Sequence, residues 1–172
     1  SVIHTLPARR HTVALVAGVF AALFLTIAAR ADQPLVCGAA IDVPDARSAP
    51  LEAFAREIGL KQIDAFVGTV AAVRRTGHVP ACYLTKRAAQ RLGWRPGRDL
   101  WAVAPGTAIG GDRFGNREGR LPAGKRYIEA DLDYEGGERG AHRLIFSEGR
   151  RAERQLWVTV DHYQTFHAVP AP

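Results

Sequence analysis

Residues 127–134 read Tyr-Ile-Glu-Ala-Asp-Leu-Asp-Tyr, and this stretch decides the fold class. Polar and apolar residues alternate along it, which places one set on each face of an extended chain. The period of two predicts a strand that carries its carboxylates on one face. Similar patterns predict strands at 108–114, 143–147 and 155–160, with an edge strand at 163–169.

The preceding part of the chain has helical periodicity instead. Apolar residues recur at helical spacing over 51–59 and over 62–75. Thr85 is placed as the N-cap of a shorter helix, with Leu92 and Trp94 expected to face the core. Helices first and an antiparallel meander second predict an α+β domain, with N-terminal helices packed on a C-terminal antiparallel sheet.

The composition excludes several classes of protein. The 172 residues carry 23 Lys and Arg against 17 Asp and Glu, and 47% of them are apolar. A disordered tail, a collagen-like chain and a disulfide-dense miniprotein are therefore excluded. Three arginines lie in the first thirty residues, which contain no acid, so the rest of the chain is only mildly basic. Such a surface permits a polyanionic partner without demanding one.

The N-terminal segment has the pattern of an export signal. Arg9 and Arg10 precede an uninterrupted apolar run over 13–29, and a small-x-small motif follows at 29–31. These features predict a secretory signal peptide over 1–31, and hence a secreted protein, extracellular or periplasmic. Because the apolar run is almost long enough to span a bilayer, an uncleaved membrane anchor is the alternative.

The cysteine count agrees with export. Cys37 and Cys82 are the two cysteines of the chain, and in an oxidising compartment they most simply form one disulfide. Two unpaired buried thiols are the alternative if the protein is not exported. The bridge would join the segment 32–50, whose three prolines predict a linker, to a domain over 51–172. No metal site is expected, because two isolated cysteines without a nearby His pair do not form a zinc set.

The second half of the chain contains a cluster of groups capable of acid–base chemistry. Glu129 and Asp131 share a strand face, and Arg139 and Arg143 follow, four residues apart. One interpretation is a cross-strand ladder of salt bridges on a solvated face. The other is a polar groove in which one carboxylate is a base and the arginines hold an anion. By residue type alone, His162 is more often a structural or exposed histidine, with a catalytic histidine as the alternative.

Four sequence blocks taken together are more specific than any of these features. They are Ala-Pro-Gly-x-x-Ile-Gly-Gly-Asp at 104–112, Phe-Gly-Asn-Arg-Glu-Gly-Arg-Leu-Pro at 114–122, Glu-Ala-Asp-x-x-Tyr at 129–134 and Asp-His-Tyr-Gln-Thr-Phe at 161–166. In order and content they resemble the barnase-like family of extracellular, guanyl-preferring microbial ribonucleases. The resemblance covers residues 62–169 and implies a ribonuclease domain that carries an extra N-terminal helix here.

The resemblance implies an RNA-cleaving enzyme that needs neither a metal nor a cofactor. In this family the ribose 2′-OH attacks the adjacent phosphorus of single-stranded RNA and leaves a 2′,3′-cyclic phosphate. Glu129 matches the general base and His162 the general acid of that reaction. Arg139, Arg143 and Lys86 match the groups that bind the phosphate, with Asp131 expected between the two arginines as their partner.

The same resemblance implies a guanine site in the loop that follows residue 114. Glu118 matches the carboxylate that accepts from guanine N1–H and the exocyclic amine, and the backbone N–H groups of Asn116 and Arg117 would meet O6. Adenine lacks this pair of donors, so a preference for guanine follows. The rings expected to stack on the base are those of Phe114, His162 and Tyr163.

The expected partners are RNA and, from the resemblance, a small acidic intracellular inhibitor of the barstar-like kind. The protein is expected to be a monomer, without membrane association once the signal is cleaved. An inactive relative that only binds RNA or an inhibitor is the alternative, and the presence of all the matching catalytic residues argues against it. Arg150, Arg151 and Arg154 are interpreted as a solvated hairpin rather than as added phosphate contacts.

Overall fold

The structure is a computed structural model that describes residues 32–172. Its first two regular elements are consecutive helices. Helix α1 spans Asp45–Glu57 and helix α2 spans Ile63–Thr76. The signal peptide or anchor predicted over 1–31 lies outside the described residues. Among the helices of the described part, none combines the length and the apolar character that crossing a bilayer requires.

Helix α1 begins at Asp45, earlier than the predicted start at Leu51, so the linker expected over 32–50 is shorter than the sequence suggests. Pro50, one of the prolines that indicated irregular chain, lies inside the helix and is exposed on its outer side. Leu51 and Ala55 are buried on the opposite side at helical spacing. Packing of this apolar stripe outweighs the backbone hydrogen bond that the proline forgoes.

Helix α2 agrees with its predicted span and is buried along most of its length. Gly77 ends it in the left-handed conformation, with φ 79°. No side chain of the helix's own N-cap residue supplies a capping bond. Instead, the carboxylate of Asp133 accepts the backbone N–H groups of Lys61 (3.1 Å) and Gln62 (2.7 Å). A residue from much later in the chain therefore satisfies the free N–H groups at the start of α2.

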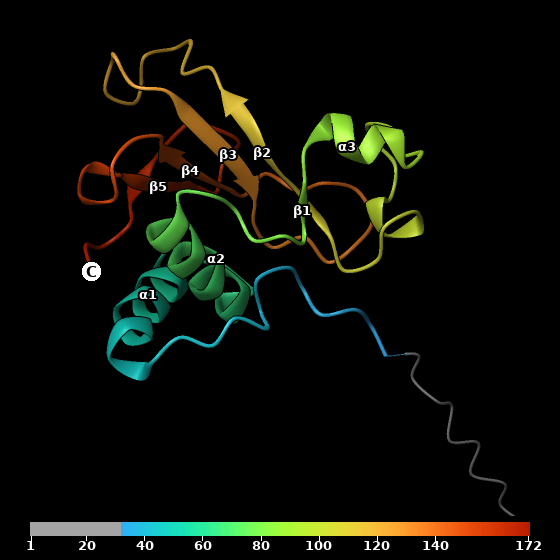
Figure 1. Ribbon diagram of the computed structural model, residues 1–172, viewed down its shortest axis with the longest axis horizontal. Coiled ribbons are helices and arrows are strands. Elements are labelled where there is room, and N and C mark those ends of the chain that lie inside the picture. Colours follow the sequence, from blue (N-terminus) through green and yellow to red (C-terminus); the bar gives the residue numbers. More distant parts are fainter. Residues whose placement is uncertain (1–31) are drawn as a thin grey trace, which may run out of the picture. The chain divides into compact units, whose positions relative to one another are not determined.

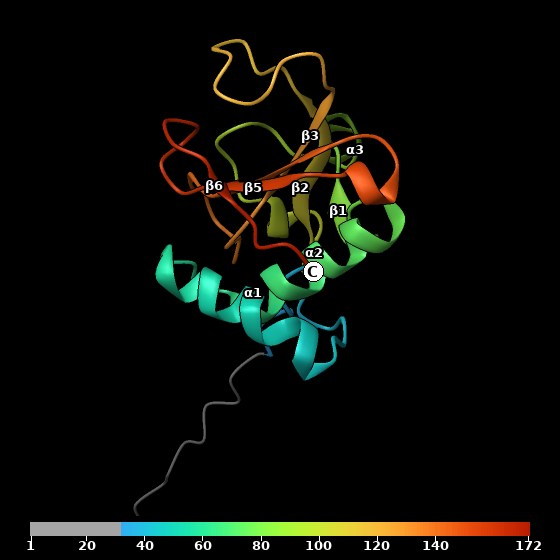
Figure 2. The ribbon, with the colours of Figure 1, turned by 90° about the vertical axis from the view of Figure 1, so that its left-hand side faces the viewer.

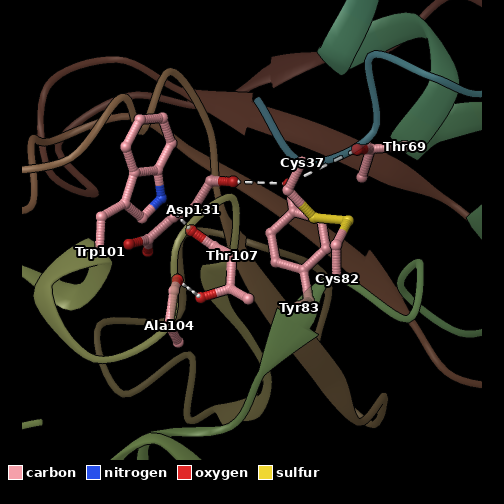
Figure 3. Close-up of a disulfide and its surroundings, with 8 residues drawn as sticks. All are labelled: Cys37, Thr69, Cys82, Tyr83, Trp101, Ala104, Thr107 and Asp131. Carbon is pink, nitrogen blue, oxygen red and sulfur yellow. Dashed lines mark hydrogen bonds between the residues drawn. A yellow bond between two sulfur atoms is a disulfide. The ribbon is translucent and has the colours of Figure 1, made fainter. Parts of the chain in front are cut away.

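The segment before α1 packs against α2 and is tied down by the predicted disulfide. Cys37 and Cys82 are bonded, with their Cα atoms 5.6 Å apart (Figure 3). Gly68 permits the approach, because a Cβ at that position would lie 2.1 Å from a carbonyl oxygen of this segment. Beside the bridge, the hydroxyl of Tyr83 donates to the carbonyl oxygen of Asp131 at 2.8 Å (Figure 3). The N-terminal segment is thus linked to the sheet.

Six strands form one sheet in the order β1-β2-β3-β4-β5-β6. The strands are β1 (Tyr83–Leu84), β2 (Ala108–Phe114), β3 (Tyr127–Asp131), β4 (Arg143–Ser147), β5 (Leu156–Thr159) and β6 (His167–Ala168). Neighbours are antiparallel except β1 and β2, which run parallel. The α+β class is confirmed, although the two-residue strand β1 is too short to be predicted from alternation.

Helix α3 (Lys86–Arg91) follows β1 directly, and its start agrees with the sequence. The hydroxyl of Thr85 accepts the backbone N–H of Ala88 at 3.2 Å, as expected of an N-cap. Trp94 is buried, as predicted, but Leu92 is 55% exposed, so its expected place in the core is wrong. A six-residue helix has room for one buried position, which Ala89 occupies. Two short 3₁₀ turns, Leu100–Ala102 and Arg151–Glu153, complete the regular elements.

The two faces of the sheet have different coverings. Figures 1 and 2 both show α1 and α2 together on one side of the sheet, where Ala130 belongs to the main core. On the other face, Tyr127 joins a smaller apolar cluster with Ile145. Glu129 and Asp131 share that second face by alternation, yet they are only 7% and 3% exposed. The solvated face assumed in the salt-bridge-ladder interpretation is therefore incorrect.

The basic segment after β4 is only partly the solvated hairpin that the sequence suggests. Arg150 and Arg151 are exposed. The guanidinium of Arg154 instead donates to the carbonyl oxygens of Val73 (2.9 Å) and Arg74 (3.0 Å) near the end of α2. Arg154 thus binds carbonyl oxygens in the last turn of a helix, where a cation is also favoured by the helix dipole.

Candidate active site

Glu129 is the central acid of the second sheet face. It lies in the middle of β3, opposite Ile145 of β4, and is nearly buried. Lys86 Nζ donates to its Oε1 at 3.0 Å, and the hydroxyl of Tyr163 donates to its Oε2 at 2.6 Å. Both carboxylate oxygens therefore have a donor from a different part of the chain.

A bulge in β2 explains how Lys86 reaches this carboxylate. The pairing with β3 shifts between Gly110 and Asp112, and Gly111 adopts φ +95° there. The carboxylate of Asp112 then accepts the backbone N–H of Lys86 at 2.9 Å. The bulge thus positions an acid on the first residue of α3, whose side chain extends to Glu129.

Asp131 is held between two arginines, as expected. Arg139 forms a bidentate pair with it, with Nε 2.6 Å from Oδ2 and Nη2 2.7 Å from Oδ1. Arg143 Nε lies 3.0 Å from the same Oδ1 as an ion pair, without the alignment of a hydrogen bond. Burial would lower the pKa of Arg139, but its bond to Asp131 and the charges of Asp131 and Glu129 raise that pKa above its ordinary value.

Arg143 is fixed from a second direction by the backbone. Its Nη1 donates to the carbonyl oxygens of Gly140 and His142, at 2.8 Å each. The side chain is only 5% exposed, although it lines an open cleft. A guanidinium held in this way presents a fixed positive charge to any anion that enters.

The loop after β5 carries the histidine and is organised by Asp161. This carboxylate accepts from the hydroxyls of Thr159 (2.9 Å) and Thr165 (2.6 Å) and from two backbone N–H groups. The bonds from Thr165, supported by those from Thr159 and the backbone, lower the pKa of Asp161 to about 2. His162 and Tyr163 both adopt left-handed conformations, with φ 54° and 72°. The loop is therefore locked in an uncommon shape.

The cleft brings the histidine and the arginines together. It encloses about 410 Å³, and the functional side chains that line it are Arg139, Arg143 and His162. Trp94 and Pro96 form part of its opposite wall. His162 is exposed, and its ring centre lies 4.9 Å from that of Tyr163.

Tyr163 has a role that residue type alone does not reveal. The sequence predicts a stacking ring, and its ring does stack on Phe114 with centres 5.1 Å apart. Its hydroxyl, however, also donates to Glu129. Burial, together with that bond and the charge of Glu129, raises the pKa of Tyr163 to about 12. Tyr163 therefore remains a neutral donor throughout the neutral pH range.

The loop after β2, which we call the base loop (residues 114–120), is held mainly by its own turn. The amide of Asn116 donates to the carbonyl of Leu121 at 2.9 Å and accepts its N–H at 3.0 Å. Asn116 itself adopts φ 44°, a conformation that asparagine tolerates better than most residues. The exposed Arg117 follows it in the turn.

Glu118, the predicted guanine acceptor, is not brought to the ionic cluster of Lys86, Glu129, Asp131, Arg139 and Arg143. Its side chain is 67% exposed and forms an ion pair with Arg120, with Nε 2.7 Å from Oε2. Arg120 also donates to the carbonyl oxygen of Gln164, which ties the base loop to the histidine loop. The role of Arg120 was not predicted from the sequence. The one signal for this ion pair is that Arg120 lies two residues after Glu118 in the same turn.

The described residues contain no group of three or more His, Cys, Asp or Glu side chains suited to a metal ion. The chemical groups on the second sheet face are instead a buried carboxylate, several fixed cations and an exposed imidazole. Such a set can accept a proton, donate a proton and neutralise an anion.

The residues of this site lie within a stretch of the chain that matches a known protein family. Residues 68–170 match the ribonuclease family, and these residues include the cluster and both loops. The chain belongs to the ribonuclease family. It is 43% identical over 110 residues to ribonucleases of Bacillus intermedius and Bacillus pumilus, covering 62% of this chain and 65% of those proteins. It is also 43% identical over 107 residues to a ribonuclease of Heyndrickxia coagulans, covering 60% of this chain and 94% of that protein.

The family match confirms the resemblance inferred from the four sequence blocks. It begins at residue 68, inside α2, so helix α1 and the disulfide-bonded segment around Cys37 precede it. The disulfide thus bonds the segment around Cys37 to Cys82, which lies within the matched residues.

Proposed function

We propose that this ribonuclease is an endonuclease that cleaves single-stranded RNA by transphosphorylation and leaves a 2′,3′-cyclic phosphate. The observation that carries the proposal is the pairing of Glu129 with neutral Tyr163 and Lys86, next to a cleft lined by His162 and two fixed arginines. A buried carboxylate beside an anion site suits a base that acts on a phosphodiester.

Each step then has a group to perform it. The 2′-hydroxyl gives its proton to Glu129 while its oxygen forms a bond to phosphorus. The bond from phosphorus to the leaving 5′-oxygen breaks, and that oxygen takes a proton from the imidazolium of His162. Arg139 and Arg143 neutralise the charge that develops on the phosphoryl oxygens. Lys86 and Tyr163 orient the carboxylate before the reaction begins.

The choice of Glu129 over Asp131 as the base rests on their partners. Asp131 is bound by two guanidinium groups, which occupy both of its carboxylate oxygens. Glu129 is bound by a lysine and by a tyrosine that keeps its own proton. A proton accepted by Glu129 therefore disturbs fewer buried charges.

We further propose that the enzyme prefers guanosine on the 5′ side of the cleaved bond. Glu118 would leave its ion pair with Arg120 and accept guanine N1–H and the exocyclic amine. Because that ion pair is exposed, its rearrangement costs little. Backbone N–H groups of Asn116 and Arg117 would meet O6, with Phe114 and Tyr163 as stacking surfaces.

Secretion, a monomeric state and a small acidic inhibitor complete the proposal. The disulfide between Cys37 and Cys82 supports an oxidising compartment. An acidic inhibitor would find a complementary surface in the cations that line the cleft.

The test is digestion of a defined RNA oligonucleotide in EDTA, with product ends identified by mass. We expect fragments that end in guanosine 2′,3′-cyclic phosphate. Glu129→Gln should lower kcat/KM by about 10²–10⁴-fold, whereas Glu57→Gln, the same change on an exposed face of α1, should not. Cyclic ends after every base would refute the guanine preference alone. No cleavage by the folded protein would favour the inactive, binding-only relative.

A further inference from the structure

The segment from Lys86 to Arg98 has an unusual charge. Five of its residues are basic and none is acidic. Beyond Lys86, which is bound to Glu129, the others are exposed to solvent, and we call them the α3 arginine track: Arg87, Arg91, Arg95 and Arg98. The ion pairs found among residues 32–172 involve none of these four.

Some exposed arginines elsewhere in the described residues have carboxylate partners. Arg56 pairs with Glu52, and Arg126 pairs with Glu148. Within the described part of the chain the α3 arginine track has no such neutralisation, so it presents a concentrated positive potential. Arginines without an ion-pair partner attract a polyanion more strongly than they attract a protein surface of mixed charge.

The track is continuous with the catalytic cleft. A second cavity of about 410 Å³ is lined by Gln90, Gly93, Trp94, Arg95 and Pro96. Two of these residues, Trp94 and Pro96, also line the cleft that contains His162. The two hollows therefore meet at a shared wall, and a chain that leaves the cleft past this wall reaches Arg95 first.

The turn that carries the track is rigid enough to present it. The indole N–H of Trp94 donates to the carbonyl oxygen of Arg98 at 2.9 Å, and the backbone N–H of Arg98 donates to the carbonyl oxygen of Arg95 at 3.0 Å. Gly97 supplies the left-handed position in this turn, with φ 79°. Within α3, Arg87 and Arg91 are four residues apart and so project from the same side.

We propose that the α3 arginine track binds the phosphates of RNA on the 3′ side of the cleaved bond. This inference rests on the proposed function, in which His162 protonates the leaving 5′-oxygen. The nucleotides beyond that oxygen would then pass Trp94 and Pro96, which line the same cleft as His162. Each arginine offers a planar, permanently charged fork that matches a phosphate.

The test compares three substrates: a guanosine-containing dinucleotide, the same dinucleotide with four added 3′ nucleotides, and one with four added 5′ nucleotides. For the wild type we expect kcat/KM to rise with the 3′ extension. The double variant Arg91→Gln/Arg95→Gln should lower the ratio of extended to dinucleotide rates by about tenfold, as expected for two exposed charge-assisted hydrogen bonds. The matched control, Arg150→Gln/Arg151→Gln, removes two exposed charges from the loop after β4 and should leave the ratio unchanged.

Salt dependence gives a second readout. The slope of log kcat/KM against log salt for the 3′-extended substrate should become shallower by about 0.7 for each phosphate that the variant no longer neutralises. A ratio and slope equal to those of the wild type, or a lower rate confined to the 5′-extended substrate, would overturn the proposal. Equal reductions on all three substrates would also overturn it, because they would show a general effect on the site.

Binding of an all-deoxy oligonucleotide, which has no 2′-hydroxyl and cannot be cleaved, separates the two proposals. If the wild type cleaves nothing but binds this probe more tightly than the double variant does, the proposed reaction fails and the track stands. If the wild type cleaves RNA and both proteins bind the probe equally, the track fails and the proposed reaction stands.

Discussion

The ionic cluster and the base loop lie next to each other and are built in opposite ways. Glu129 and Asp131 are nearly buried in a central strand, and their partners come from α3, the segment after β3 and the loop after β5. Glu118 is mostly exposed, and its partner is two residues away in the same turn. One region is assembled by the whole fold and the other by local sequence.

In the proposed function, this difference separates two tasks of the site. Stabilising a phosphoryl transition state requires charges that do not move during the reaction, and a buried network supplies them. Reading a base requires a side chain that can exchange one partner for another, and an exposed ion pair permits this at small cost. The comparison can be tested by removing the same kind of group from each region.

The largest effect is expected from Asp131→Asn. Removing the charge leaves the buried guanidinium of Arg143 and the partly buried guanidinium of Arg139 with a weaker partner, so the free energy of unfolding should fall by about 3–5 kcal/mol. Denaturant unfolding measures it, with Asp42→Asn, an exposed position, as the control. A decrease below about 1 kcal/mol, the range of exposed pairs, would contradict the view that the cluster is a buried network.

Removing the disulfide should lower the free energy of unfolding by a similar amount. It should leave the ionic cluster and the base loop unchanged. It closes a loop of 45 residues, so replacing both cysteines by serine should lower the free energy of unfolding by about 4 kcal/mol in the chain-entropy treatment. The bridge lies on the helix-covered side of the sheet, in the main core. We therefore expect kcat on a dinucleotide to be unchanged at temperatures where the variant is folded. A large decrease in kcat would show that the N-terminal segment shapes the cluster.

A smaller effect is expected from Glu118→Gln. If the carboxylate accepts both guanine donors, the preference for guanine over adenine should fall by about 1–3 kcal/mol, or roughly tenfold to a hundredfold. The free energy of unfolding should change by less than about 0.5 kcal/mol, because the side chain is exposed. The ratio of kcat/KM for guanosine and adenosine dinucleotides measures the first quantity. An unchanged ratio would remove Glu118 from the base site.

The smallest effect concerns the histidine loop, which is exposed like the base loop but firmly bonded. The pKa of Asp161 is lowered from its ordinary 3.8 to about 2. Its hydrogen bonds therefore stabilise the folded state fully at pH values above 3.8. That contribution is lost as pH falls through about 2. We expect the backbone N–H resonances of Gln164 and Thr165, which donate to Asp161, to keep their folded positions down to about pH 3, and Asp161→Ala to lose them at neutral pH. Their disappearance in the wild type near pH 4 would show that Asp161 is not the organising group.

Much of the fold was accessible from periodicity. The spans of α2 and β2, the N-cap at Thr85 and the two faces of β3 follow from local spacing, because each depends on contacts within a few residues. The start of α1 could not be predicted from local spacing, because burial against α2 overrides the local signal of Pro50. Strand β1 could not be predicted either, because its two residues are extended only where they pair with β2.

For the site, the chemical groups, the family of the chain and the place of Asp131 between two arginines could all be predicted from the sequence. The burial of the polar face of β3, the bond from Tyr163 to Glu129 and the ion pair of Glu118 with Arg120 became visible only in the folded chain. The reason is physical. Residue type and spacing decide which groups can interact, but burial and hydrogen bonding are set by segments that meet only when the chain folds.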